Sequence, residues 1–214
     1  DRYSYDNLNN FSLVSGIRAD IHNNLGTFLT PRLHLRYLPD PKTILRASFG
    51  SGRKAANIFA ENQTLFGTNR VISIVENGGL IYGLNPEKAW NYGISVRQLF
   101  NIGSTSGDIT ADYYITNFID QVVVDWEQKH QITFYNLEGP SRANSFQLSV
   151  DYALNETLDF RFAYKNYDVN TTYNSGFLQR PLQAKNRFFA NMGWGTEQNK
   201  KGAQWRWDLT YHAI

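Results

Sequence analysis

The sequence contains no cysteine, and this absence excludes several classes of site at once. Without thiols there are no disulfides, no thiolate metal centres and no cysteine nucleophiles. Histidine is also scarce, and the four histidines do not form the closely spaced pairs of metal-binding motifs. They are His22, His34, His130 and His212. No metal site and no cofactor are therefore predicted.

Charged residues are few as well, at 19% of the chain, where soluble domains carry about a quarter. The formal net charge of +2 gives no reason to propose nucleic acid as a partner. The glycine-containing turns are not followed by a phosphate-binding pattern, and no catalytic constellation emerges. We therefore expect a protein that is not an enzyme.

Long hydrophobic runs are missing too. No stretch approaches the roughly 18 apolar residues that a transmembrane helix requires. This does not exclude a membrane, because the strands of a transmembrane barrel carry only a weak, alternating signal. Aromatic residues, which are enriched in β-strands, make up 15% of the sequence.

Apolar and polar residues alternate in segment after segment, which indicates β-strands with two different faces. In 157–165, for example, Leu158, Phe160 and Phe162 point one way, and the charged residues point the other. About nine such segments are found, with no convincing helix. They are 12–22, 29–38, 43–50, 89–100, 108–118, 145–154, 157–165, 184–194 and 203–213.

The connections between these segments alternate between short and long. Residues 39–42, 101–107, 155–156 and 195–202 are short and rich in turn-forming residues, whereas 51–86, 119–143 and 167–182 are long. In an antiparallel meander, alternate connections lie at the same end of the sheet. Tight turns at one end and long loops at the other are typical of outer-membrane barrels.

The charges decide which face would meet lipid. An arginine at the midplane of a lipid-facing surface costs roughly 2–4 kcal/mol, so the charged face of each strand must line a polar interior. We expect the carboxylates among these residues to pair with arginines across the ladder. The predicted interior residues include Arg46, Arg97, Asp112, Asp151, Asp159, Arg161 and Arg187.

Several motifs resemble the barrel of the TonB-dependent outer-membrane receptors. The stretch "SGIRADIHNNLGTFLTPRLHLRYLPDPKTILRASFGSGRKAANIF" (15–59) is similar to the family's succession of strand, glycine loop, "TPR" strand, turn and "TLRAS" strand. "LNPEKAWNYGIS" (84–95) and the hairpin in 118–152 follow in the family's order. The resemblance covers essentially the whole chain, and its loops are similar to those of receptors of the Bacteroidetes group.

This resemblance implies an all-β fold, in which residues 1–214 are part of a 22-stranded transmembrane barrel whose interior is filled by a plug domain. The plug domain, the TonB-binding segment and the final strands are not in the sequence, which begins in polar residues and stops in the middle of an alternating pattern. We therefore expect a piece of a longer transporter in the outer membrane of a Gram-negative bacterium. Its implied partners are outer-membrane lipid, the plug, TonB, and a metal-chelate or vitamin ligand.

The implied function is energised import of a scarce, large nutrient such as a ferric siderophore, haem or cobalamin. Ligand contacts are expected on extracellular loops. The hairpin between the strands of 108–126 and 131–154 is expected to continue above the membrane, with a turn near residues 128–130. The ligand candidates are Arg53, Lys54, Arg70, Trp126, Tyr135, Tyr173, Phe177 and Arg180. Arg46, Arg97 and Arg161 are implied to contact the plug.

Two other readings are open at this point. A soluble all-β module could use the same aromatic residues to bind carbohydrate. A porin or adhesin could use the same barrel without a plug.

Overall fold

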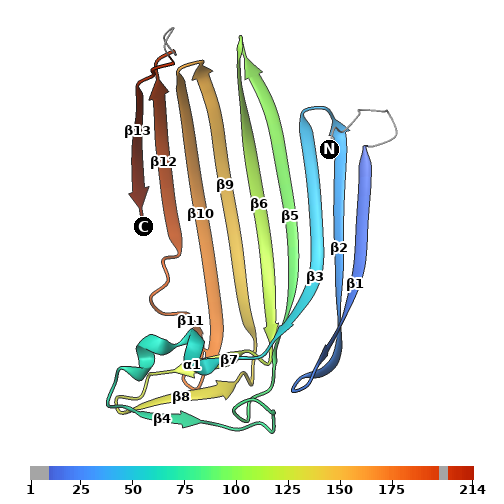
Figure 1. Ribbon diagram of the computed structural model, residues 1–214, viewed down its shortest axis with the longest axis vertical. Helices are drawn as coiled ribbons and strands as arrows, with labels where there is room; N and C mark the ends of the chain where they lie inside the picture. Colours follow the sequence, from blue (N-terminus) through green and yellow to red (C-terminus); the bar gives the residue numbers. More distant parts are fainter. Residues whose placement is uncertain (1–9, 198–201) are drawn as a thin grey trace.

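The computed structural model describes residues 10–197 and 202–214 of the 214-residue chain. Nine long strands stand side by side in one antiparallel sheet, in the order in which they occur along the chain (Figure 1). The predicted meander of about nine long strands is therefore confirmed. The strands are β1 (Phe11–His22), β2 (Gly26–Asp40), β3 (Thr43–Lys54), β5 (Glu87–Ile102), β6 (Thr105–Ile119), β9 (Ser141–Asn155), β10 (Leu158–Tyr173), β12 (Asn186–Gly195) and β13 (Arg206–Ala213).

The two ends of this sheet differ, as the connection lengths predict. At the upper end in Figure 1, which we call the turn end, β2 joins β3, β5 joins β6 and β9 joins β10 through two-residue turns. Gly103 has a φ of 62° in the turn between β5 and β6, a conformation that favours glycine. The long connections 55–86, 120–140 and 174–185 all lie at the opposite, loop end.

The strand register separates the two faces of the sheet, because directly opposed residues of a ladder share a face. One row across the sheet is apolar and contains Tyr37, Leu45, Val96, Ala111, Leu148, Tyr164 and Phe188. The next row is polar and contains Arg36, Arg46, Ser95, Asp112, Gln147, Lys165 and Arg187. We call these the outward and inward faces. The predicted segregation of charge to one face is confirmed.

No second layer covers the outward face in the described part of the chain. Large apolar side chains on it are exposed, among them Ile17 (75%), Ile94 (58%) and Phe162 (51%). A soluble protein does not expose a continuous apolar face of this extent. The hydrophobic side chains of this sheet therefore require a covering from outside the chain.

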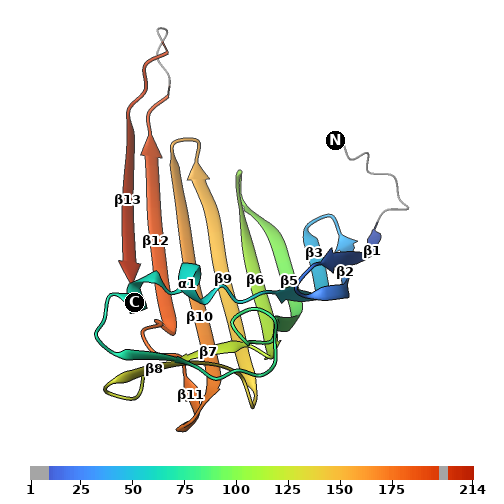
Figure 2. The ribbon, with the colours of Figure 1, turned by 60° about the horizontal axis from the view of Figure 1, so that its bottom comes forward.

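The main cluster of buried residues lies outside the large sheet, in the loops. It contains Ala56, Ile58, Leu84, Ile132 and Phe134, and we call the two loops that form it, residues 55–86 and 120–140, the cap. The cap holds a small sheet of β4 (Val71–Ile74), β8 (Gln131–Asn136) and β7 (Val122–Asp125), in that order. Figures 1 and 2 show these strands crossing the loop end transverse to the long strands.

Two sequence predictions are wrong in the cap. The hairpin does turn at residues 126–130, but β7 and β8 do not continue β6 and β9 in one ladder. Asp120, with a φ of 55°, breaks the chain direction, and β8 then pairs in parallel with β4. Short helices also occur, α1 (Ile58–Glu61) and η1 (Gln63–Phe66), where none was expected. The Asn57 side chain caps α1 by accepting a hydrogen bond from the Ala60 N–H.

Candidate ligand-binding site

The two loops of the cap are joined to each other by a buried asparagine. The amide of Asn136 is 2% exposed and accepts a hydrogen bond from the Asn85 N–H (2.7 Å). It donates to the carbonyl oxygens of Asn85 (3.0 Å) and Asp120 (2.9 Å). One side chain thus joins the end of the first loop, the break after β6 and strand β8.

Charged groups attach the cap to the long strands at the ends of β3 and β5. Lys88 Nζ lies 3.0 Å from a carboxylate oxygen of Asp120. The carboxylate of Glu87 accepts a hydrogen bond from the Val122 N–H and lies 3.2 Å from Lys54 Nζ. Lys54 also pairs with Glu61 of α1 at 2.8 Å. The cap therefore sits on the sheet as an anchored unit.

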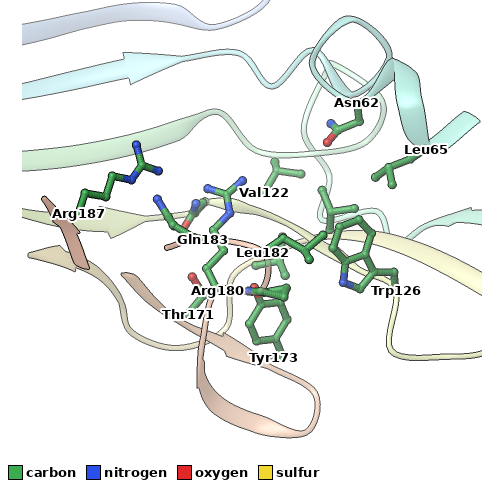
Figure 3. A pocket seen from close by; sticks show the side chains of 14 residues that line it. Asn62, Leu65, Val122, Trp126, Thr171, Tyr173, Arg180, Leu182, Gln183 and Arg187 are labelled. Carbon is green, nitrogen blue, oxygen red and sulfur yellow. The ribbon is translucent and has the colours of Figure 1, made fainter. Parts of the chain in front are cut away.

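A hollow of about 480 Å³ lies between the cap and the loop end of β10. Figure 3 shows Arg180 and Tyr173 near its middle, with Trp126 and Arg187 on opposite sides in this view. Strand β11 (Gly176–Gln179) pairs with β10 and leads into the lining segment 180–183. The lining residues are Asn62, Leu65, Gln121, Val122, Val123, Val124, Trp126, Thr171, Tyr173, Arg180, Pro181, Leu182, Gln183 and Arg187.

The hollow is cationic. Its lining contains Arg180 and Arg187 but no carboxylate, and neither arginine forms an ion pair with any described residue. Arg187 is directly opposite Lys165 in the ladder between β12 and β10. Like charges in directly opposed positions repel each other, so this end of the inward face favours an anion. Trp126 and Tyr173 add aromatic surface for a ring.

The structure brings three of the eight predicted ligand candidates together in this hollow: Trp126, Tyr173 and Arg180. Arg70 is not part of the lining, but it donates a hydrogen bond to the carbonyl oxygen of the lining residue Trp126 (3.3 Å). Tyr135 lies on β8, where burial, and then the nearby Asp125 carboxylate, raise its pKa to about 12.

Like Arg70 and Tyr135, the remaining three candidates do not line the hollow. Arg53 lies at the end of β3 with its guanidinium 5.1 Å from the ring centroid of Phe28. Lys54 is engaged with the two glutamates described above. Phe177 lies on β11 and is 54% exposed.

The sequence prediction did not select the polar lining residues Asn62, Gln121 and Gln183. Arg187 was predicted only as an interior residue. These positions carry no local signal, because they meet only when three separate loops fold together. Only the two cations Lys165 and Arg187, which lie on neighbouring strands without an acidic partner, could have indicated from the sequence where this hollow lies.

The predicted interior residues lie in two further hollows on the inward face. One, of about 610 Å³, contains Arg46 and Asp112. The other, of about 620 Å³, contains Arg97, Asp151, Asp159 and Arg161.

Ion pairs cross the second of these hollows. Arg161 forms a pair with Asp151, which confirms the expected pairing across the ladder for that carboxylate. Arg97 pairs with Asp108 at 3.0 Å, and this partner was not among the predicted residues.

Neither a metal cluster nor a membrane-spanning helix is found in the described residues. No group of three or more histidine, aspartate or glutamate side chains there is arranged to hold a metal ion. None of the helices in residues 10–197 and 202–214 has the length and hydropathy to cross a bilayer.

The fold and its two faces define a class: this sheet is part of the wall of a transmembrane β-barrel, and it carries a cap at its loop end. The family description "TonB dependent receptor-like, beta-barrel" matches residues 1–213. The chain therefore belongs to the TonB-dependent receptors, as part of the β-barrel that these proteins form in the Gram-negative outer membrane. No match is found among curated proteins.

Solved structures of receptors share this fold at low sequence identity. The FrpB iron transporter from Neisseria meningitidis is 17% identical, with a TM-score of 0.60 over 94% of this chain and 31% of that chain. The ferric enterobactin receptor PfeA from Pseudomonas aeruginosa, in complex with enterobactin, is 11% identical, with a TM-score of 0.54 over 96% and 35%.

The siderophore receptor PirA from Pseudomonas aeruginosa is also 11% identical, with a TM-score of 0.51 over 96% of this chain and 46% of that chain. The chain thus spans less than half the length of these receptors.

Proposed function

We propose that this chain is part of an outer-membrane receptor that imports an anionic ferric siderophore with energy supplied through TonB. Family membership and the iron and siderophore receptors of the same fold support this proposal. The rest of the barrel, the plug domain and the TonB-binding segment would belong to other parts of the parent chain. The likeness to Bacteroidetes receptors stays a prediction.

The observation that carries the proposal is the cationic, aromatic hollow at the loop end. Arg180 and Arg187 face no carboxylate there, and Trp126 and Tyr173 offer flat surfaces. Tris-catecholate ferric complexes are anionic and aromatic, so charge-assisted hydrogen bonds and ring contacts would both favour them. The inward face beyond the hollow is polar and continues from Arg187 to Lys165, Gln147 and Asp112.

Binding of a ferric tris-catecholate to the full-length receptor in detergent tests the proposal. The double variant Arg180→Gln/Arg187→Gln removes both cations, and we expect its Kd to rise roughly 150-fold or more, because each charge-assisted hydrogen bond contributes about 1.5–3 kcal/mol. The matched control, Lys42→Gln/Lys129→Gln, loses the same charge outside the hollow and should bind like the wild type.

A neutral ferric trihydroxamate, haem and cobalamin serve as competing ligands in the same assay. Preference of the wild type for any of these over the tris-catecholate would contradict the proposed ligand class. Equal binding of the tris-catecholate by the double variant and the wild type would show that the hollow is not the site.

A further inference from the structure

We propose that Gln121 and Gln183 bind a carboxamide group of the ligand in the hollow. This inference rests on the proposed function and narrows its ligand class to ferric catecholates that carry an amide beyond the one attached to the catechol ring. The two arginines of the hollow offer a ligand only hydrogen-bond donors. The two glutamines offer one donor group and one acceptor, which is the combination that recognises an amide.

Gln183 contributes the acceptor. Its Oε1 is buried and has no hydrogen-bond partner in the described part of the chain. Such an atom is costly, because it has lost its hydrogen bonds to water and has gained none from the protein. In the view of Figure 3, Gln183 lies between Arg187 and Arg180, among the groups proposed to hold the anion. A ligand N–H that donates to this oxygen would remove the cost.

Gln121 contributes the donor, because its own carbonyl oxygen is already occupied. The Ser141 hydroxyl donates a hydrogen bond to Gln121 Oε1 at 2.6 Å. A hydroxyl has only one hydrogen, so in the 3.0 Å contact between Ser141 Oγ and Thr171 Oγ1 the donor is Thr171. The N–H groups of the Gln121 amide bond no acceptor within residues 10–197 and 202–214, so they remain available to a ligand.

The barrel wall holds this chain of hydrogen bonds in place. Ser141 and Thr171 are directly opposite each other in the ladder between β9 and β10, and both are buried. Buried hydroxyls keep their hydrogen-bond partners, because no water replaces them. Gln121 and Thr171 both line the hollow, so the wall orients the Gln121 amide before a ligand arrives.

A secondary amide is the ligand group that fits both glutamines, with its C=O toward Gln121 and its N–H toward Gln183. The amide attached directly to a catechol ring does not qualify, because its N–H donates to the neighbouring catecholate oxygen. An ester accepts hydrogen bonds but donates none, so it would leave Gln183 without a partner. Sites with buried polar groups discriminate strongly against analogues that leave those groups unpaired. We therefore expect the hollow to prefer amide-linked catecholates over ester-linked ones.

A matched pair of ligands tests this inference. Two synthetic ferric tris-catecholates of equal charge carry a second amide in each arm, which has its N–H in one compound and is N-methylated in the other. Their Kd values are measured with the full-length receptor in detergent. We expect the wild type to bind the N–H compound about 10-fold more tightly. Gln183→Met, which keeps the size of the side chain but removes the acceptor, should bind the two compounds equally.

Two further variants separate the roles of the glutamines. Gln128→Met, at an exposed position outside the hollow, is the matched control and should keep the wild-type preference. Ser141→Ala releases the Gln121 amide, so it should weaken the binding of both compounds without changing their ratio. Resistance of the barrel to SDS before heating shows which variants are folded. If Gln183→Met does not fold, Gln183→Leu takes its place with the same expectation.

Equal binding of the two compounds by the wild type would overturn this inference and leave the proposed function standing. An undiminished preference in a folded Gln183 variant would also overturn it, because the preference would then come from the bulk of the methyl group. Failure of the wild type to bind either compound would instead contradict the proposed function, and this inference with it.

Discussion

Single residues decide how the loops of the cap are held together, and Asn136 is the clearest case. It is a polar side chain with 2% exposure that bonds three backbone groups from two different segments. Buried backbone groups that lose their partners are costly, because water does not replace the lost bonds. The asparagine therefore determines how the two loops of the cap lie against each other.

Replacing this residue should loosen the cap selectively. We expect Asn136→Ala to lower the free energy of opening of the cap by about 3 kcal/mol, because three hydrogen bonds are lost at a buried position. Hydrogen exchange in the full-length receptor should accelerate at residues 84–86 and 120–122, and not in the long strands. Asn24→Ala, in an exposed loop, should change neither, and uniform acceleration throughout the barrel would contradict this role.

The phenol of Tyr135 gives the cap a dependence on alkaline pH. Its pKa is raised from 10.0 to about 12, so the folded cap disfavours the phenolate that the unfolded chain accepts. The resulting stabilisation is complete below pH 10 and is lost as the pH rises from 10 to about 12. Cap exchange rates measured across this window should rise more steeply in the wild type than in Tyr135→Phe. Identical slopes would contradict the assignment.

For single residues, the sequence predicted which residues take part in a site better than it predicted their bonding partners. Arg161 and Asp151 could be paired because both lie on charged faces of adjacent strands. The partner of Arg97, which is Asp108, and the three bonds of Asn136 could not be predicted, since an asparagine in a strand pattern has no local signature of burial. The hollow was found in part because Trp126, Tyr173 and Arg180 are types that ligands favour.

Among the elements, the cap and the large sheet are stabilised in different ways. The cap has its own buried cluster, in which Phe134 is fully buried. The large sheet depends on its ladders and on the medium around its outward face. A defect in the cluster of the cap should therefore remain confined to the cap.

Phe134→Ala tests this separation. Truncating a buried phenylalanine typically costs about 3–5 kcal/mol, enough to unfold a small loop domain. We expect new proteolytic cleavage within residues 55–86 and 120–140, while the barrel still resists SDS before heating. Phe177→Ala, at an exposed position of β11, is the control and should give no new cleavage. Loss of SDS resistance in Phe134→Ala would show that cap and barrel fold as one unit.

The long strands were predictable and the cap was not, for a physical reason. The two faces of a long strand meet different environments, so apolar and polar residues alternate along it with a period of two. This alternation is present in every long strand. In the cap, "QVVVDWEQKHQITFY" keeps strand character throughout, yet the chain turns away at Asp120. Parallel pairing of β4 with β8 joins residues about 60 positions apart and leaves no trace in local periodicity.

For the whole molecule, a new charge should be harmful on the outward face and tolerated on the inward face. Phe162 lies in the middle of the outward band, and Ala163 follows it on the inward face. Phe162→Arg should cost roughly 2–4 kcal/mol and reduce the amount of folded receptor in the outer membrane. Ala163→Arg should leave that amount near the wild-type level, as measured by heat-modifiable mobility. Equal losses in both variants would contradict the orientation.

The central claim is that the outward face of this sheet lies in lipid. The most direct measurement uses nitroxide labels at single cysteines from position 158 to 165 of the full-length receptor in bilayers. This part of the receptor has no cysteine of its own, and any cysteine outside it is first replaced by serine. We predict that collisions with oxygen peak at Leu158, Phe160, Phe162 and Tyr164, and that collisions with a water-soluble nickel chelate peak at the residues between them. Accessibility to oxygen and nickel that does not alternate along β10, or that alternates with the opposite phase, would contradict the account.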